Sequence, residues 1–444
     1  MLNRQRAEDV FRKVLKWSTA DETEAMVGST VYSLTRFANN TIHQNVAEEG
    51  SYLSVRAVVE QRTARATTNK FDENSIREAC ERALVLARLQ PPDPDLLPMP
   101  GPQTYRSLDR FDEETARLSP QARAETVRTV IARAEKDHLT AAGVFSSGAS
   151  VTALFNSRGL RAFHEETTSE FSVTMLDSSS SGWAKKTSHH WSELEPEALG
   201  DRAARKAIES REPREVPPGK YTVILEPAAV LDLLGFLFMD FGGLAVHEKR
   251  SCLTGRVGSK VFADNINVRD DVYHPMQGGP PFDGEGAPRK RVALVEKGVV
   301  THLVYSRQTA RKVGAKATGH GFPLPNEVGE APMNIVFAGG KSSLEQMVSS
   351  TERGLLVTRL WYIREVDPYQ KILTGMTRDG TFWVENGEAR YGVRNFRFNQ
   401  SVIEMLRQVE MMTPPQRTAG EESFEMVVPA MKVREFNLSS LTKF

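Results

Sequence analysis

The sequence predicts an α+β protein in which two meander-and-helix units precede a part rich in β-strands. Two proline-containing segments, residues 91–104 and 213–219, divide the 444-residue chain. Proline fixes φ and lacks an N–H donor, so such segments favour extended connectors. At roughly 150 residues per domain, the length also predicts about three units. We therefore expect two N-terminal α/β units at residues 1–90 and 105–212, followed by a β-rich C-terminal unit at residues 219–444.

The first unit has the pattern of a helix, a meander and a second helix. Residues 1–18 carry apolar side chains at i, i+3, i+4, i+7 and i+8, which predicts an amphipathic helix without the apolar core of a signal peptide. Ser75 and Glu78 form a capping-box pattern at the start of a helix predicted over 75–89. Between the helices, segments rich in Val, Thr, Tyr and Ile predict strands over 25–36, 42–46, 52–60 and 63–68.

The second unit repeats this order, although its likeness to the first is one of pattern only. Ser119 and Pro120 begin a predicted helix, and residues 197–210 form a closing helix with an alanine-rich face. Between these helices, strands are predicted over 141–147, 150–156, 160–166 and 170–176.

The third unit is organised around residues 281–321. Apolar runs at 292–295 and 299–305 flank Gly298, which can adopt the positive φ of a tight turn, so we expect an antiparallel hairpin. Ser306 is the predicted N-cap of a short helix over 308–313.

The rest of the third unit combines one apolar helix with antiparallel strands. Residues 228–241 are apolar on nearly every side, which predicts a helix that is buried or lies at an interface. A long strand is predicted over 355–366, and Asn386-Gly387 is a strong hairpin signal. Asn399 is the expected N-cap of the last helix.

Composition excludes several classes of protein. Lys+Arg and Asp+Glu both number 57, so no overall positive field favours nucleic acid. The two cysteines, Cys80 and Cys252, are too few for a disulfide scaffold. The most apolar segment, residues 228–241, is shorter than the roughly 20 residues that cross a bilayer. We expect a cytoplasmic protein with neither a membrane nor a nucleic acid as partner.

One pair of residues deserves comparison with a zinc site. His247-Glu248 begins like the HExxH motif of zinc peptidases, but Ser251 stands at i+4, and only Cys252 at i+5 offers another ligand. A catalytic zinc needs three protein ligands, and the spacing of the remaining histidines indicates no third one. A charged loop after the buried helix is the simpler interpretation. The alternative is a self-sufficient metallopeptidase with an atypical site at His247, Glu248 and Cys252.

Several spaced motifs make the chain resemble the TldD/PmbA family, whose PmbA member is also called TldE. The motifs are TRFANNTIHQ (35–44), PFDGEG with the following hairpin and helix (281–321), GLLVTRLWYIREVDP (354–368), TRDGTFWVENGE (377–388) and VVPAMKVREF (427–436). The resemblance implies an α/β N-terminal part and a β-rich C-terminal domain that dimerises. It also implies zinc-dependent cleavage of small or unfolded peptides in the cytosol, with roles in peptide maturation and proteolysis.

The departures from the family pattern concern the metal. Catalytic TldD-like members carry HExxxH on the helix that follows the strand expected at 221–225. Transferred by position, its histidines fall on Gly235 and Asp240 and its glutamate on Phe236. These members also take a zinc ligand from a late cysteine, and this chain has none after Cys252. The resemblance therefore implies a PmbA/TldE-type subunit with no catalytic, cofactor-binding or metal-binding residues of its own.

The implied partners follow from that subunit type. We expect a heterodimer with a TldD-like paralogue that holds the zinc, or a homodimer, and an unstructured peptide as substrate. A non-enzymatic peptide-binding module is a further alternative.

Overall fold

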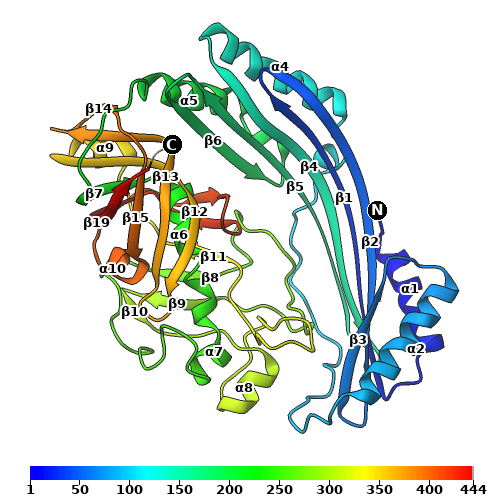
Figure 1. The fold of residues 1–444 in the computed structure, drawn as a ribbon. Coiled ribbons are helices and arrows are strands. Elements are labelled where there is room, and N and C mark those ends of the chain that lie inside the picture. Colours follow the sequence, from blue (N-terminus) through cyan, green and yellow to red (C-terminus); the bar gives the residue numbers. More distant parts are fainter. Residues whose placement is uncertain (443–444) are drawn as a thin grey trace.

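The computed structural model, which describes residues 1–442, has an α+β fold, as the sequence predicts. A long, curved antiparallel sheet forms one side of the molecule, and the third unit lies against its concave side (Figure 1). None of the helices within residues 1–442 is long and apolar enough to cross a bilayer.

The long sheet joins the strands of the first two units in the order β3-β2-β1-β4-β5-β6. The two units meet where β1 pairs with β4, from Glu24 opposite Asn156 to Phe37 opposite Gly143. The strands are β1 (Glu22–Ala38), β2 (Thr41–Val59), β3 (Arg62–Thr68), β4 (Thr140–Asn156), β5 (Arg161–Leu176) and β6 (Ser181–Ser188).

The strands are longer and fewer than the sequence predicts, and the expected breaks inside β2, β4 and β5 are wrong. Gly50, for example, continues β2 because it lies opposite Thr30 in an unbroken ladder with β1. Glycine weakens a strand but does not end it when a neighbouring strand satisfies its backbone.

Helices cover the convex side of this sheet, where alternate side chains are apolar (Figure 1). At one end, Phe11 of α1 packs with Leu53 and Phe155 of the sheet, and at the other end Val130 of α4 packs with Phe171. The helices are α1 (Arg4–Trp17), α2 (Glu73–Leu89), the short α3 (Glu113–Ala116), α4 (Pro120–Lys136) and α5 (Pro196–Glu209), with a 3-10 turn η1 (Trp191–Glu193) before α5.

The helix starts of these units agree in part with the sequence. Ser119 caps α4 as predicted, since its side chain accepts from the Ala122 N–H. The capping box expected at Ser75 is wrong because Asp72 is the N-cap of α2, and its side chain accepts from the Ser75 N–H. The helix therefore starts three residues earlier than predicted, with the Asp72 carboxylate as its cap instead of the Ser75 hydroxyl.

The third unit contains a closed ring of strands. The strands follow the order β12-β7-β19-β15-β13, and a β12–β13 pairing closes the ring, while β14 and β16 attach to it. The predicted hairpin at Asn386-Gly387 is confirmed, with φ of +53° and +81° at its two residues. The strands are β7 (Gly219–Leu225), β12 (Arg353–Asp367), β13 (Ile372–Glu385), β14 (Glu388–Gly392), β15 (Phe396–Ser401), β16 (Val409–Met412) and β19 (Met431–Leu441).

A second, smaller sheet of the third unit contains the central hairpin. Its order is β10-β9-β8-β11-β18-β17. The turn at Gly298 is confirmed, with φ of +76°, and a Cβ there would collide with the Phe262 carbonyl. Ser306 caps α8 (Arg307–Val313) as predicted. The strands are β8 (Val268–Asp270), β9 (Val292–Glu296), β10 (Val299–Val300), β11 (Ile335–Phe337), β17 (Gln416–Thr418) and β18 (Met426–Val428).

The apolar helix of the third unit is buried as expected but interrupted. It ends at Leu234, and the segment continues as separate short turns instead of one helix to residue 241. The last helix begins after Ser401, not after Asn399, because Asn399 still pairs with Thr374 inside β15. The helical elements are α6 (Pro227–Leu234), η2 (Phe238–Phe241), α7 (Gly243–His247), α9 (Leu344–Ser349) and α10 (Val402–Arg407).

Candidate functional site: a cavity between the curved sheet and the third unit

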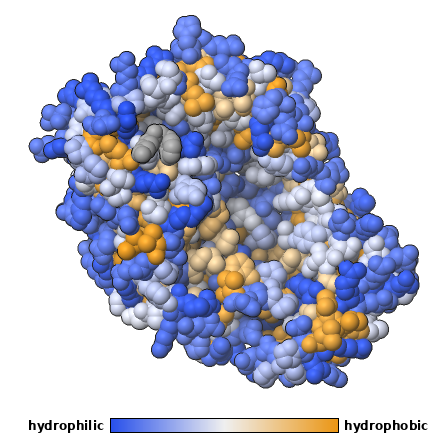
Figure 2. Space-filling view, viewed as in Figure 1, coloured by the Kyte–Doolittle hydropathy of each residue, from blue (hydrophilic) through white to orange (hydrophobic). Residues whose placement is uncertain are grey.

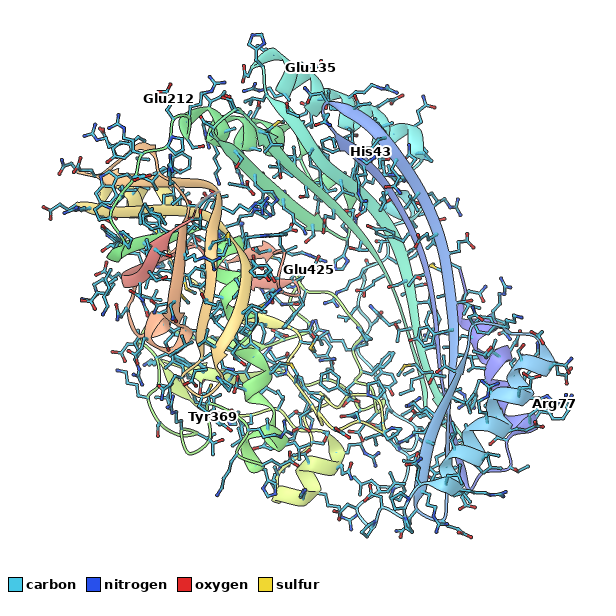
Figure 3. All side chains as sticks on the ribbon, in the orientation of Figure 1. His43, Arg77, Glu135, Glu212, Tyr369 and Glu425 are labelled. Atoms are coloured by element: carbon cyan, nitrogen blue, oxygen red, sulfur yellow. The ribbon has the colours of Figure 1, made fainter. Side chains whose placement is uncertain are left out.

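A cavity of about 580 Å³ lies between the concave face of the sheet and the loops of the third unit. Figure 2 shows the molecule hollowed between these two parts, and Figure 3 places Glu425 at the hollow. The volume falls within the roughly 300–1,000 Å³ of ligand pockets. The lining residues used below are Met26, Glu166, His189, Gln277, Gly279, Asp283, Arg289, His320, Phe322, Met333, Arg417, Phe424 and Glu425.

Strand alternation explains why this face of the sheet is free to form a cavity. Successive side chains of a strand point to opposite faces. Val27 and Phe155 pack under the helices on the convex side, whereas Met26 and Glu166 line the cavity. One end of the concave face is sealed by an apolar contact between Leu154 and Phe282 of the third unit.

Three polar side chains hold the loop at residues 277–280 against the sheet. The Gly279 N–H donates to Glu166 Oε2 at 2.7 Å, and Arg110 Nη1 donates to the Gly279 carbonyl at 2.7 Å. His189 Nε2 lies 3.0 Å from the Gln277 carbonyl oxygen. Burial would raise the pKa of Glu166, but the His164 imidazole, whose Nε2 lies 3.6 Å from Glu166 Oε2, and the hydrogen bond from the Gly279 N–H outweigh burial and lower it to about 2. Glu166 is therefore an anion that positions backbone, not a proton donor.

A second wall is built on two buried carboxylates. Asp283 accepts hydrogen bonds from the N–H groups of Glu285, Ala287 and Gly321, although burial raises its pKa. Asp270 Oδ1 lies 2.9 Å from His320 Nε2, and both side chains are fully buried. These carboxylates stabilise the loops that end at the cavity.

The contact between His320 and Asp270 is one that sequence reasoning missed, since Asp270 lies 50 residues earlier in the chain. The second ring nitrogen, Nδ1, lies 2.9 Å from Thr318 Oγ1, so both nitrogens are engaged. A histidine held on both sides orients the glycine-rich turn and is not free to act as a base.

The positions of the zinc motif do not fit a metal. At the end of α6, a Cβ on Gly235 would collide with the side chain of Ser423. Asp240 is buried, lies 2.6 Å from Lys371 Nζ, and accepts from the Cys252 N–H at 2.7 Å. An ion pair and backbone packing thus occupy the place where two imidazoles and a carboxylate would be needed.

The alternative site at His247, Glu248 and Cys252 is not assembled either. His247 and Glu248 are exposed, and Glu248 pairs with Arg250. Cys252 is only 3% exposed, and burial raises the pKa of its thiol to about 12, far from the thiolate that binds zinc. Across residues 1–442, no group of three or more His, Cys, Asp or Glu side chains is arranged to hold a metal ion.

Comparison of the sequence with known proteins identifies the family of this chain. Residues 23–87, 113–211 and 218–440 match domain 1, the central domain and the C-terminal domain of the PmbA/TldA metallopeptidases. Metalloprotease PmbA of Escherichia coli O157:H7 is 26% identical over 406 residues, covering 86% of this chain and 85% of that protein. A PmbA homologue of Haemophilus influenzae is 23% identical over 374 residues, covering 80% and 79%.

The fold agrees with a solved structure of this type. The crystal structure of TldE from Thermococcus kodakarensis superimposes with a TM-score of 0.88 at 23% identity, covering 97% of this chain and 99% of that one. A relative that is named a TldD homologue, from Buchnera aphidicola, is 24% identical over 232 residues, covering 50% of this chain and 45% of that protein. By its matched domains and its fold, the chain belongs to the PmbA/TldD metallopeptidase family.

Proposed function

We propose that this chain is the metal-free, PmbA/TldE-type subunit of a cytosolic zinc metallopeptidase complex that acts on small or unfolded peptides. The observation that carries the proposal is the replacement of the zinc motif. Gly235, Phe236 and Asp240 occupy its positions, and Asp240 is committed to Lys371 at 2.6 Å. In this proposal a TldD-like paralogue supplies the zinc and the cleavage, and this chain supplies a wall that holds the peptide.

The cavity supports the role in peptide holding. Residues 277–280 and 320–323 of its lining are glycine-containing loops, and glycine allows a peptide main chain to approach closely whatever its side chains are. Half-buried apolar side chains, such as Phe322 and Phe424, lie beside these loops. A small or unfolded peptide can enter a space of this size, whereas a folded domain cannot.

The test is reconstitution. This chain, a TldD-like paralogue from the same genome and an equimolar mixture would each be incubated with an unstructured peptide, and cleavage would be followed by mass spectrometry. We expect that cleavage requires the paralogue and increases when this chain is added. We also expect the two chains to co-purify. The subunit proposal would be contradicted if this chain alone cleaved the peptide as fast as the mixture, or if the two chains did not associate.

The second candidate is a peptide-binding module without any peptidase. The cavity favours it because, among the described residues, the His, Asp and Glu side chains of its lining form no group of three or more that could hold a metal ion. Binding of unstructured peptide by this chain, with no effect on cleavage by any paralogue, would select this candidate.

A further inference from the structure

We propose that the cavity binds the C-terminal carboxylate of a short peptide, with Arg289 as the cation and an apolar last residue against the neighbouring aromatic and methionine side chains. This inference rests on the proposed peptide-holding function and adds which end of the peptide is recognised.

The first observation is that Arg289 makes no ion pair within residues 1–442, although it lines the cavity. Its positive charge offsets part of the burial that raises the pKa of Asp283, and it acts on Asp270 as well, but neither carboxylate binds the guanidinium. Its Nε makes one long contact, 3.4 Å to the Phe282 carbonyl, and its Nη1 is buried without any hydrogen-bond partner among the described residues. A buried N–H group without an acceptor is unfavourable, so an incoming oxygen would satisfy it.

The nearby acids are already engaged, which explains why they leave Arg289 unpaired. Asp283 accepts three backbone N–H groups, and Asp270 is held by His320 and by the N–H groups of Met333 and Asn334. Their positions are set by these bonds, so neither can turn toward the guanidinium without leaving a loop amide unsatisfied.

The other charged groups of the cavity wall are paired with each other or with backbone. Arg417 Nη2 donates to Glu425 Oε2 at 2.6 Å, and Glu166 accepts from the Gly279 N–H. His189 lies between two carbonyl oxygens, 2.7 Å from that of Thr167 and 3.0 Å from that of Gln277. Among the charged side chains that line the cavity within residues 1–442, Arg289 alone is left to bind an anion.

The surroundings of Arg289 select a carboxylate that belongs to an apolar residue. Met26, Phe322, Met333 and Phe424 are half-buried and line the same cavity. The planar guanidinium matches the two oxygens of a carboxylate in a bidentate geometry. The last residue of a peptide offers a carboxylate and an apolar side chain together. An aspartate or glutamate side chain offers the carboxylate alone, and its binding would bring the peptide backbone against the apolar wall.

The experiment measures binding to the full-length chain by isothermal titration calorimetry. The probes are N-acetyl-Ala-Ala-Phe with a free carboxylate, the same tripeptide as its C-terminal amide, and N-acetyl-Ala-Glu-Phe-amide, which carries its carboxylate on a side chain. We expect the free acid to bind at least roughly tenfold more tightly than either amide, as a charge-assisted pair should provide.

Variants then assign the effect to Arg289. Arg289→Gln should weaken the free acid to the level of its amide, and Arg289→Lys, which keeps the charge but not the fork, should retain part of the preference. Arg291→Gln is the matched control, because Arg291 is two residues away, 62% exposed and paired with Asp271. Circular dichroism and thermal melting check that each variant is folded.

The outcomes separate this inference from the function on which it rests. Equal binding of acid and amide by the unaltered chain, or tight binding of the Glu-containing amide, overturns recognition of the C-terminus while peptide holding stands. Retention of the full acid preference by Arg289→Gln overturns the role of Arg289. Absence of binding by all three peptides contradicts peptide holding itself. The comparison of acid with amide needs no variant, so it decides the matter even if Arg289→Gln does not fold.

Discussion

Replacing Lys371 with methionine removes the cation that Asp240 faces at the zinc-motif position of the third unit. Asp240 and Lys371 are 6% and 4% exposed, and their charged atoms lie 2.6 Å apart. Lys371 also contacts Glu365 Oε1 at 2.8 Å, but the Glu365 side chain is 32% exposed and can be solvated instead. The cost of the substitution therefore falls on Asp240.

The expected loss follows from leaving one buried charge without its partner. Removal of one member of a buried ion pair costs about 3–5 kcal/mol in the free energy of unfolding. Asp240 keeps the hydrogen bond from the Cys252 N–H, so we expect the lower part of this range, about 3 kcal/mol. The double variant Asp240→Asn/Lys371→Met removes both charges but keeps an oxygen that can accept from the Cys252 N–H, so it should be within about 1 kcal/mol of the original chain.

The assay is urea denaturation of the original chain, both single variants and the double variant, followed by far-ultraviolet circular dichroism. The four unfolding free energies give the coupling between the two side chains. A loss below about 1 kcal/mol for Lys371→Met, or a double variant no more stable than the singles, would refute the reasoning that this pair defines the metal-free site.

Three further predictions concern metal, pH and turn geometry. The purified chain should hold far less than one zinc ion, and chelators should leave its melting temperature unchanged; a tightly held zinc that is lost on His247→Ala or Cys252→Ser would support the self-sufficient peptidase instead. Burial raises the pKa of Asp232 to about 7, above the roughly 3.9 of an unfolded aspartate, so its contribution to stability is fully present below about pH 4 and is lost as the pH rises to about 7. Asp232→Asn should therefore match the original chain near about pH 4 and exceed it by up to about 4 kcal/mol near about pH 8 in urea denaturation, and an unchanged pH profile would contradict this assignment. Gly298→Ala should lower the melting temperature more than Gly314→Ala, because both have positive φ but only Gly298 would add a collision, with the Phe262 carbonyl; equal losses would mean that strain alone matters.

Features decided within a few residues could be predicted from the sequence. The caps at Ser119 and Ser306 and the turns at Gly298 and Asn386-Gly387 depend on side chains and φ preferences of adjacent residues, and the structure has each of them. The absence of HExxxH is likewise visible in the chain, because the motif is short and the strand before it is easily located. The resemblance to the family rests on the same kind of local pattern.

Features that depend on distant pairing could not be predicted. The continuity of β2 through Gly50 requires β1 alongside it, and the apolar helix ends at Leu234, beside a glycine that leaves no room for a side chain because Ser423 packs against it. His320 has its partner, Asp270, 50 residues earlier in the chain. Backbone and side-chain groups are satisfied by whichever segment the fold brings near, and a linear pattern does not contain that information.

The sequence by itself determined the α+β class, the local turns and caps, the family and the loss of the zinc motif, because each of these is written in neighbouring residues. Only the tertiary structure decided that Asp240 pairs with Lys371 and that Cys252 is buried while His247 is exposed. It alone also decided that the concave sheet and the third-unit loops enclose a cavity in which Arg289 forms no ion pair among the described residues. The reason is that charge pairing and enclosure depend on distances between segments far apart in the chain, and those distances exist only once the core has packed.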